Sequence, residues 1–124
     1  MRFRDIALGV VLSFAVVTGA NAHHSFAALY DVAKTISLSG EVTKLEFKSP
    51  HAYIHFKVTG SGGKSEAWQI ETTTPGMLIR AGLTPETLRV GDKVSVTGNP
   101  TRDGRKIIRL LTITMPNGKK LELQ

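Results

Sequence analysis

Two β-strands and the corner between them are encoded by one stretch of the sequence, GEVTKLEFKSPHAYIHFKV (residues 40–58). The apolar residues after the corner recur at every second position: Ala52, Ile54, Phe56 and Val58. A period of two is typical of a strand with one buried face and one face in water. Ser49-Pro50 ends the strand before the corner, because proline cannot donate to a strand ladder.

The strand before the corner changes phase along its length. Its apolar or small residues occupy every second position and then shift by one: Ile36, Leu38, Gly40 and Val42, followed by Leu45 and Phe47. Such a shift indicates a β-bulge, in which one extra residue bends the strand. Bending lets a small sheet close on itself, so the pattern predicts a long first strand of a small barrel.

Further strands follow from alternation and from turn signals. They are predicted over residues 66–71, 93–97, 106–115 and, at the rim, 119–123. Trp68 and Ile70 share one face of the first of these, and Val94 and Val96 point inward from the second. Residues 106–115 carry apolar side chains in both phases. We therefore expect either that both faces of this strand are covered or that a second bulge intervenes.

A short helix is predicted between the third and fourth strands. Thr74-Pro75 is typical of a helix start, with a hydroxyl N-cap followed by proline, and Gly82 is typical of a helix end. We expect residues 75–81 to plug one end of the barrel with the apolar face of this helix: Met77, Leu78 and Ala81.

Three strands, a capped helix and then two more strands is the element order of the oligonucleotide/oligosaccharide-binding (OB) fold. We predict a mainly β protein, a small OB-fold-like barrel of five to six strands, closed or partly open. An immunoglobulin-like sandwich fits less well, because it needs about seven strands and has no helix in the middle.

The first 22 residues have the pattern of a signal peptide. Arg2 and Arg4 precede an apolar run at residues 6–17, and Ala20-Asn21-Ala22 is a small-x-small cleavage site. The apolar run is shorter than the roughly 20 residues that a membrane-spanning helix needs. We expect cleavage after Ala22 and a single domain over residues 23–124, periplasmic and without an integral membrane anchor.

The composition narrows the possible chemistry. The chain has no cysteine, so disulfides, thiolate zinc sites and cysteine nucleophiles are excluded. Its net charge is +6 with neutral histidines, and the basic residues are scattered singly, as is usual for a solvated surface. Serines lie outside any nucleophile-elbow pattern, and no phosphate-cradling glycine motif precedes a helix. We expect no catalytic residues.

Several motifs carry a resemblance to a known family: Ala22-His23-His24-Ser25-Phe26, Gly40-Glu41-Val42-Thr43, Pro50-His51-Ala52-Tyr53, Trp68, residues 75–82 and residues 88–94. Together they resemble a family of small exported bacterial proteins classed as a domain of unknown function. The resemblance runs over nearly the whole mature chain. It implies a bacterial, periplasmic protein with one compact β domain, and it implies no established activity.

The histidines are the candidate metal ligands. Cleavage after Ala22 would make His23 the amino-terminal residue, whose α-amine and imidazole can chelate one Cu(II) from two sides. His24, or His51 at the corner, can supply a second imidazole. His55 lies four residues after His51, about 13 Å along a straight strand, too far to share one ion with it. In the alternative interpretation these residues bind no metal: His23 and His24 belong to a polar leader, and His51 forms a hydrogen bond within its own turn.

Three functions remain open from the sequence. The first is a non-catalytic periplasmic binding or accessory protein that holds a small molecule, a glycan or a protein partner near residues 49–53. Its candidate ligand surface is aromatic and polar: Phe47, Tyr53, His55 and Trp68. The second is a copper-binding protein, and the third is an enzyme of unknown reaction. Nucleic acid can stack on such aromatic residues, but an exported protein seldom meets it.

Overall fold

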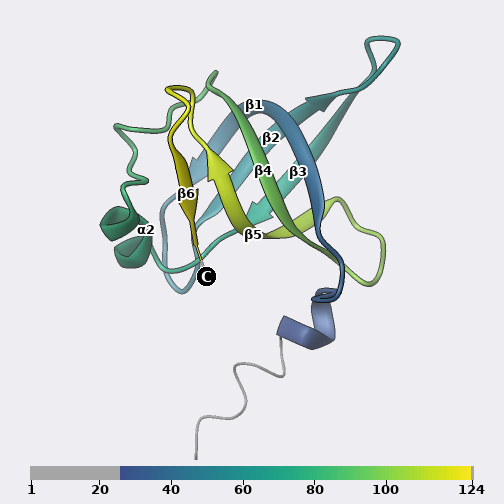
Figure 1. The fold of residues 1–124 in the computed structure, drawn as a ribbon, viewed down its shortest axis with the longest axis horizontal. Coiled ribbons are helices and arrows are strands. Elements are labelled where there is room, and N and C mark those ends of the chain that lie inside the picture. Colours follow the sequence, from purple (N-terminus) through teal and green to yellow (C-terminus); the bar gives the residue numbers. More distant parts are fainter. Residues whose placement is uncertain (1–25, 124) are drawn as a thin grey trace, which may run out of the picture.

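The computed structural model describes residues 26–123; the predicted leader, His23 and His24 lie outside the described residues. The strands and the helix between them follow in this order (Figure 1): β1 (Ile36–Glu46), β2 (Tyr53–Thr59), β3 (Ser65–Glu71), α2 (Pro75–Ala81), β4 (Lys93–Pro100), β5 (Ile107–Thr114) and β6 (Lys120–Glu122). The predicted strands and helix are therefore all present. No helix in the described residues is long and apolar enough to cross a bilayer.

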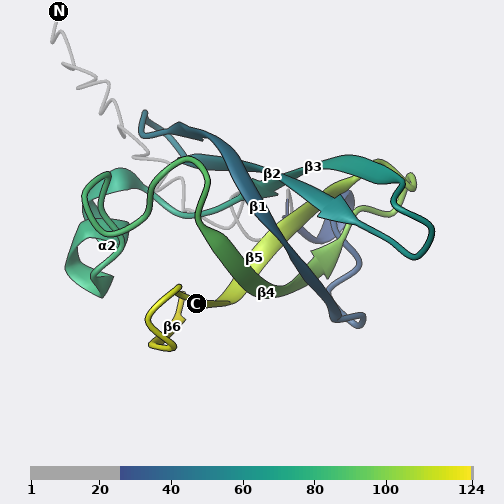
Figure 2. The ribbon, with the colours of Figure 1, turned by 90° about the horizontal axis from the view of Figure 1, so that it is seen from above.

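The sheet closes into a barrel. Antiparallel pairs join β1 to β2 and β4, β2 to β3, and β4 to β5. The barrel is closed by a parallel pair, in which Gln69, Ile70 and Glu71 of β3 lie opposite Ile107, Ile108 and Arg109 of β5. Strand β6 extends the sheet beyond β5, and Figure 2 shows β1 crossing over β4 and β5 as the sheet coils. The predicted OB-fold-like barrel is confirmed.

Two bulges bend the long strands. In β1, Val42 pairs with Phe56 and Lys44 pairs with His55, so Thr43 is the extra residue. The phase shift in the sequence marks this bulge correctly. A second register shift follows Thr97. Thr97 pairs with Thr112 and Gly98 with Leu110, so Leu111 is the extra residue in the partner strand β5. This bulge explains why the apolar residues of β5 change phase, since an extra residue turns the following side chains to the other face.

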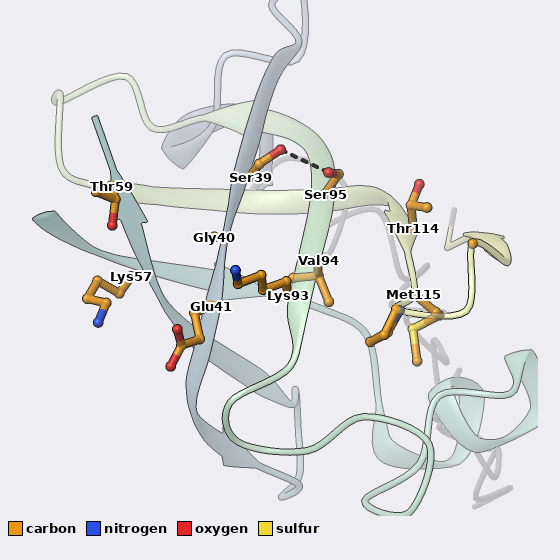
Figure 3. Close-up of a pocket in the computed structure, with 12 residues that line it drawn as sticks. Ser39, Gly40, Glu41, Lys57, Thr59, Lys93, Val94, Ser95, Thr114 and Met115 are labelled. Atoms are coloured by element: carbon orange, nitrogen blue, oxygen red, sulfur yellow. Dashed lines mark hydrogen bonds between the residues drawn. The ribbon is translucent and has the colours of Figure 1, made fainter. Parts of the chain in front are cut away.

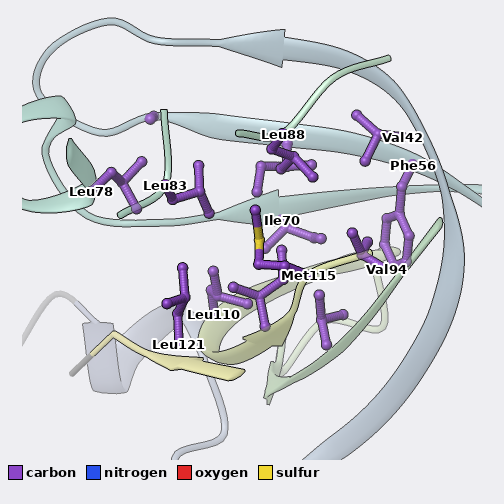
Figure 4. Close-up of a cluster of buried hydrophobic side chains, with 14 of the residues drawn as sticks. Val42, Phe56, Ile70, Leu78, Leu83, Leu88, Val94, Leu110, Met115 and Leu121 are labelled. Carbon is purple, nitrogen blue, oxygen red and sulfur yellow. The ribbon is translucent and has the colours of Figure 1, made fainter. Parts of the chain in front are cut away.

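The barrel interior holds one apolar core (Figure 4). Leu78 of α2 and Leu83, just after the helix, are fully buried at one end of this core. Thr74 caps the helix by accepting a hydrogen bond from the amide of Met77 at 3.3 Å. The prediction that α2 plugs the barrel is confirmed for Leu78 but wrong for Met77, whose side chain is 45% exposed. A helix this short turns only a narrow face to the core.

The amino-terminal segment is fastened to the connection between β4 and β5. Residues 26–29 form a helical turn, and Tyr30 then makes an isolated bridge with Thr101. Arg102 donates twice to this segment, from its backbone amide to the carbonyl of Leu29 at 2.9 Å and from Nε to the carbonyl of Ala27 at 2.8 Å. These bonds place Tyr30, which is buried, beside the barrel wall.

Candidate ligand site around His51 and Glu71

The carboxylate of Glu71 joins three separate parts of the chain. Glu71 is the last residue of β3, and its Oε1 lies 2.8 Å from Nδ1 of His51 in the β1–β2 corner. Its Oε2 accepts a short hydrogen bond from the hydroxyl of Tyr30 in the amino-terminal segment. Both oxygens are therefore occupied by side chains that are 20 and 41 residues away in the sequence.

The imidazole of His51 is held on its face as well as at its edge. The ring of Phe26 stacks on it, with ring centroids 5.6 Å apart and planes 21° from parallel. The guanidinium of Arg109, on β5, lies 4.5 Å from the centre of the Phe26 ring. A cation over an aromatic face is stabilising, so Arg109 helps to keep Phe26 on the histidine.

The contact with Glu71 determines which nitrogen of the His51 ring can bind a ligand. A carboxylate only accepts hydrogen bonds, so Nδ1 of neutral His51 carries the proton and Nε2 carries a lone pair. This arrangement, a carboxylate behind a histidine, is the one that orients metal-binding histidines in proteins. His51 is about 29% exposed, so its ring remains accessible to a ligand.

Two hollows flank this His51–Glu71 pair. One, of about 330 Å³, is lined by Glu71, Tyr30, Tyr53, Gln69 and Arg105 among others. Burial and then the hydrogen bond to Glu71 raise the pKa of the Tyr30 phenol. Burial and then the charge of Glu71 raise the pKa of Tyr53. Both phenols are protonated at neutral pH, and both residues line this hollow.

The second hollow lies on the other side, between the corner and α2. It has a volume of about 130 Å³, and His51, Phe26, Arg109 and Met77 are among the residues that line it. Leu110 and Leu123 form part of its apolar wall. A ligand in this hollow would meet the His51 ring on a largely apolar surface.

His55 belongs to a different cluster. Its Nε2 lies 2.7 Å from Oε2 of Glu46, and Lys44 and Lys48 each approach the other oxygen of Glu46 at 3.4 Å. The hydrogen bond with His55 is the main reason that the pKa of Glu46 falls to about 2. His51 and His55 therefore have different carboxylate partners, Glu71 and Glu46, and the expectation that they do not share one ion stays a prediction.

The remaining aromatic candidates are divided between the core and the surface. Phe47 and Trp68 are partly buried against the core, and Trp68 Nε1 donates to Glu66 at 3.3 Å. Trp68 and His55 line one shallow hollow of about 290 Å³, whereas Tyr53 lines the hollow beside Glu71. The predicted ligand surface of Phe47, Tyr53, His55 and Trp68 thus does not form one continuous site.

A wider cleft lies elsewhere on the barrel, across β1 and β4 (Figure 3). It has a volume of about 630 Å³. Figure 3 shows Ser39, Glu41 and Lys93 around it, with the Ser39 and Ser95 hydroxyls 2.8 Å apart. None of the candidate residues from the sequence is among those that line it.

Sequence reasoning missed four parts of the His51 site: Phe26, Tyr30, Glu71 and Arg109. Of these four residues, only Phe26 belongs to a motif that the sequence analysis singled out, His-His-Ser-Phe. The described residues contain no group of three or more His, Cys, Asp or Glu side chains placed to hold a metal ion. His23 and His24, the other predicted copper ligands, lie outside the described residues.

The strand order and the helix between β3 and β4 define an OB-fold barrel. Solved structures agree. Two crystal forms of Rim1, a mitochondrial single-stranded DNA binding protein from S. cerevisiae, match at 12% and 11% identity with TM-scores of 0.52 and 0.50. Each match covers 66% of this chain, and 92% and 91% of Rim1. This likeness shows the fold alone.

The family is shown by the sequence. The model of a family described as "Family of unknown function (DUF6152)" matches residues 10–108, which is most of the chain, so the protein belongs to DUF6152. A complex of TiaS with a transfer RNA and ATP also matches, at 24% identity and a TM-score of 0.44, over 66% of this chain and 18% of TiaS. No curated protein matches the chain.

Proposed function

We propose that this protein is an exported, periplasmic binding or accessory protein without catalytic activity, whose ligand is held at the surface around His51 and Glu71. The ligand would be a small molecule, a glycan or a segment of a protein partner. One observation carries the proposal: Glu71 and Phe26 hold the His51 ring at its edge and on its face.

Preorganisation supports a binding role for these residues. A ring that is already fixed loses little side-chain entropy when a ligand arrives, so more of the contact energy appears as affinity. Tyr30, Tyr53 and Gln69, which carry polar groups, line the neighbouring hollow. A few convergent polar groups beside apolar walls are typical of small-ligand sites.

Nucleic acid is a less suitable ligand. Rim1 is a single-stranded DNA binding protein, but single-strand binding uses exposed aromatic platforms between basic residues. Here Trp68 and Phe47 pack against the core, and Glu46 of β1 and Glu71 of β3 lie on either side of Tyr53 in the sheet.

Ligand screening by NMR would test the proposal. A panel of small molecules, glycans and peptides is added to ¹⁵N-labelled mature protein, and we expect the shifts of a binding compound to centre on His51 and Glu71. His51→Ala should abolish that response, and His55→Ala should retain it. Equal loss in both variants, or shifts confined to the cleft at Ser39 and Lys93, would reject this site.

A copper-binding function is the second candidate, and the position of Phe26 favours it. Phe26 stacks on His51 and is three residues after His23 in the sequence. One residue spans at most about 3.6 Å, so an amino terminus at His23 could reach the His51 ring. The α-amine and imidazole of His23, with an imidazole from His24 or His51, would form the nitrogen set that Cu(II) favours.

Calorimetry with Cu(II) tests this second candidate. Mass spectrometry first establishes whether His23 is the amino-terminal residue of the exported protein. We expect tight binding by the protein that begins at His23 and a large loss when one residue is added ahead of His23. Unchanged binding by the extended protein would exclude amino-terminal chelation.

A further inference from the structure

We infer that Met77 and His51 together form a binding site for Cu(I), with the thioether sulfur of Met77 and Nε2 of His51 as ligands. The inference extends the copper-binding candidate above and shares its metal, but both of its ligands lie in the part of the chain that the structure describes. It is carried by the position of Met77, which the sequence pattern assigns to the core.

The start of α2 is tied to the corner that carries His51. The hydroxyl of Thr73 donates to Met77 Sδ at 3.2 Å, and the carbonyl of Thr73 accepts from the amide of Ala52 at 3.0 Å. Ala52 directly follows His51. Two short contacts therefore connect the Met77 sulfur to the backbone beside the histidine.

Met77 and His51 line the same small hollow, of about 130 Å³. The helix buries Leu78 fully but leaves the Met77 side chain 45% exposed. Core packing therefore does not explain the position of Met77. A thioether and an imidazole that share one hollow provide two metal ligands of the kind that copper accepts.

The other ring nitrogen of His51 is already used. Because Glu71 occupies Nδ1, Nε2 is the nitrogen left for a metal, and a carboxylate behind the ring makes it a better ligand. The contact with Glu71 that supports the proposed ligand site therefore also orients the His51 ring for Cu(I).

The surroundings favour a singly charged, soft ion. Thioether ligands select Cu(I), whereas Cu(II) prefers nitrogen and oxygen. Phe26, Leu110 and Leu123 give the hollow an apolar wall. Arg109 lines it too, with its guanidinium 4.5 Å from the centre of the Phe26 ring, and this positive charge repels a divalent ion more strongly than a monovalent one.

The test uses the full mature protein and Cu(I) itself. Cu(I) is supplied anaerobically as its bicinchoninate complex, and the affinity is read from the competition. We expect Met77→Leu to weaken Cu(I) binding about tenfold or more, equivalent to about 1.4 kcal/mol, and His51→Ala to do the same. The matched control is Met115→Leu, which removes a buried sulfur outside this hollow and should leave the affinity unchanged.

Two measurements complete the test. X-ray absorption of the Cu(I) protein should show a sulfur neighbour that disappears in Met77→Leu and persists in Met115→Leu. Met77 is partly exposed and leucine is close to methionine in volume, so this variant should fold, and thermal unfolding checks that it does. No Cu(I) binding by the wild-type protein, equal affinities of wild type and Met77→Leu, or a copper spectrum without sulfur would overturn the inference.

The experiments can reject the Cu(II) proposal and the Cu(I) proposal independently of each other. An added residue ahead of His23 should weaken Cu(II) binding, whereas Met77→Leu should leave Cu(II) binding within about twofold of wild type. Loss of Cu(I) binding in Met77→Leu supports the Met77 site even when the extended protein binds Cu(II) normally. Equal loss of Cu(I) and Cu(II) binding in Met77→Leu would count against a separate Cu(I) site.

Discussion

Nδ1 of His51 lies 2.8 Å from Oε1 of Glu71, and this contact joins the β1–β2 corner to the end of β3. The other oxygen of Glu71 accepts from Tyr30, so one carboxylate holds the corner and the amino-terminal segment together. Hydrogen bonds to a charged group stabilise more than neutral ones.

Glu71→Gln should destabilise the protein by about 1–3 kcal/mol, because an amide offers one acceptor oxygen where the carboxylate offers two and a charge. Urea unfolding measures the loss. Glu66→Gln is the control, since Glu66 is half-exposed in its ion pair with Lys106 and such pairs contribute about 0–1 kcal/mol. Equal losses in the two variants would show that Glu71 does not join these segments.

Stability should depend on Glu46 at low pH. The pKa of Glu46 is lowered to about 2 in the fold, against about 4.3 in an unfolded chain. A carboxyl with a lowered pKa stabilises the fold above the unfolded value, and this contribution is lost as the pH falls through the folded value.

The melting temperature of wild type should therefore exceed that of Glu46→Gln near pH 6, and the difference should vanish between about pH 4.3 and about pH 2. NMR titration of Glu46 gives a direct check. His55→Ala should raise its pKa, because the bond with His55 is the main cause of the shift. A Glu46 that titrates near 4.3 in wild type would contradict this assignment.

Gly40→Ala should be strongly destabilising. A methyl group at this position of β1 would lie 2.5 Å from the carbonyl oxygen of Lys57 and from the ring of Phe56. The backbone cannot give way without opening the barrel, so we expect a loss of about 1–3 kcal/mol or more. Gly60→Ala is the control, since its nearest new contact would be 3.7 Å away. Melting temperatures of the two variants should differ clearly, and equal values would argue against close strand crossing at Gly40.

Leu78→Ala should cost about 2–5 kcal/mol, because it opens a cavity at a fully buried position of the barrel end. Ile79→Ala, one residue later on the same helix, changes a side chain that is 55% exposed and should cost much less. Denaturant unfolding of both variants measures the difference. Similar losses would mean that α2 does not close the core through Leu78.

Local signals account for the elements that the sequence predicts correctly. The shift from Val42 to Leu45 marks the β1 bulge, and the mixed phases of residues 106–115 indicate the one in β5. Thr74 and Gly82 delimit α2 because caps act within a few residues of the helix ends. The sequence misplaces Met77 because a seven-residue helix is too short for its periodicity to define a face.

The candidate site depends on contacts that no local pattern encodes. His51 can be selected from the sequence as a residue of a tight corner, but Glu71 is one of several carboxylates on strands with nothing to distinguish it. Tyr30 and Arg109 offer no signal. Tyr30 is linked to His51 through Glu71, and Arg109 is linked to it through Phe26. These links exist because the amino-terminal segment runs back over the barrel to the β4–β5 connection.

The sequence by itself determined the strands, their bulges, the capped helix and the order that predicts an OB-fold, because alternation, turns and caps are properties of neighbouring residues. Only the tertiary structure decided which residues share a site. The parallel pairing of β3 with β5 closes the barrel, and that closure brings Tyr30, His51, Glu71 and Met77 to one end of it. Contacts between residues 20 or more positions apart depend on the path of the whole chain, and no short stretch specifies that path.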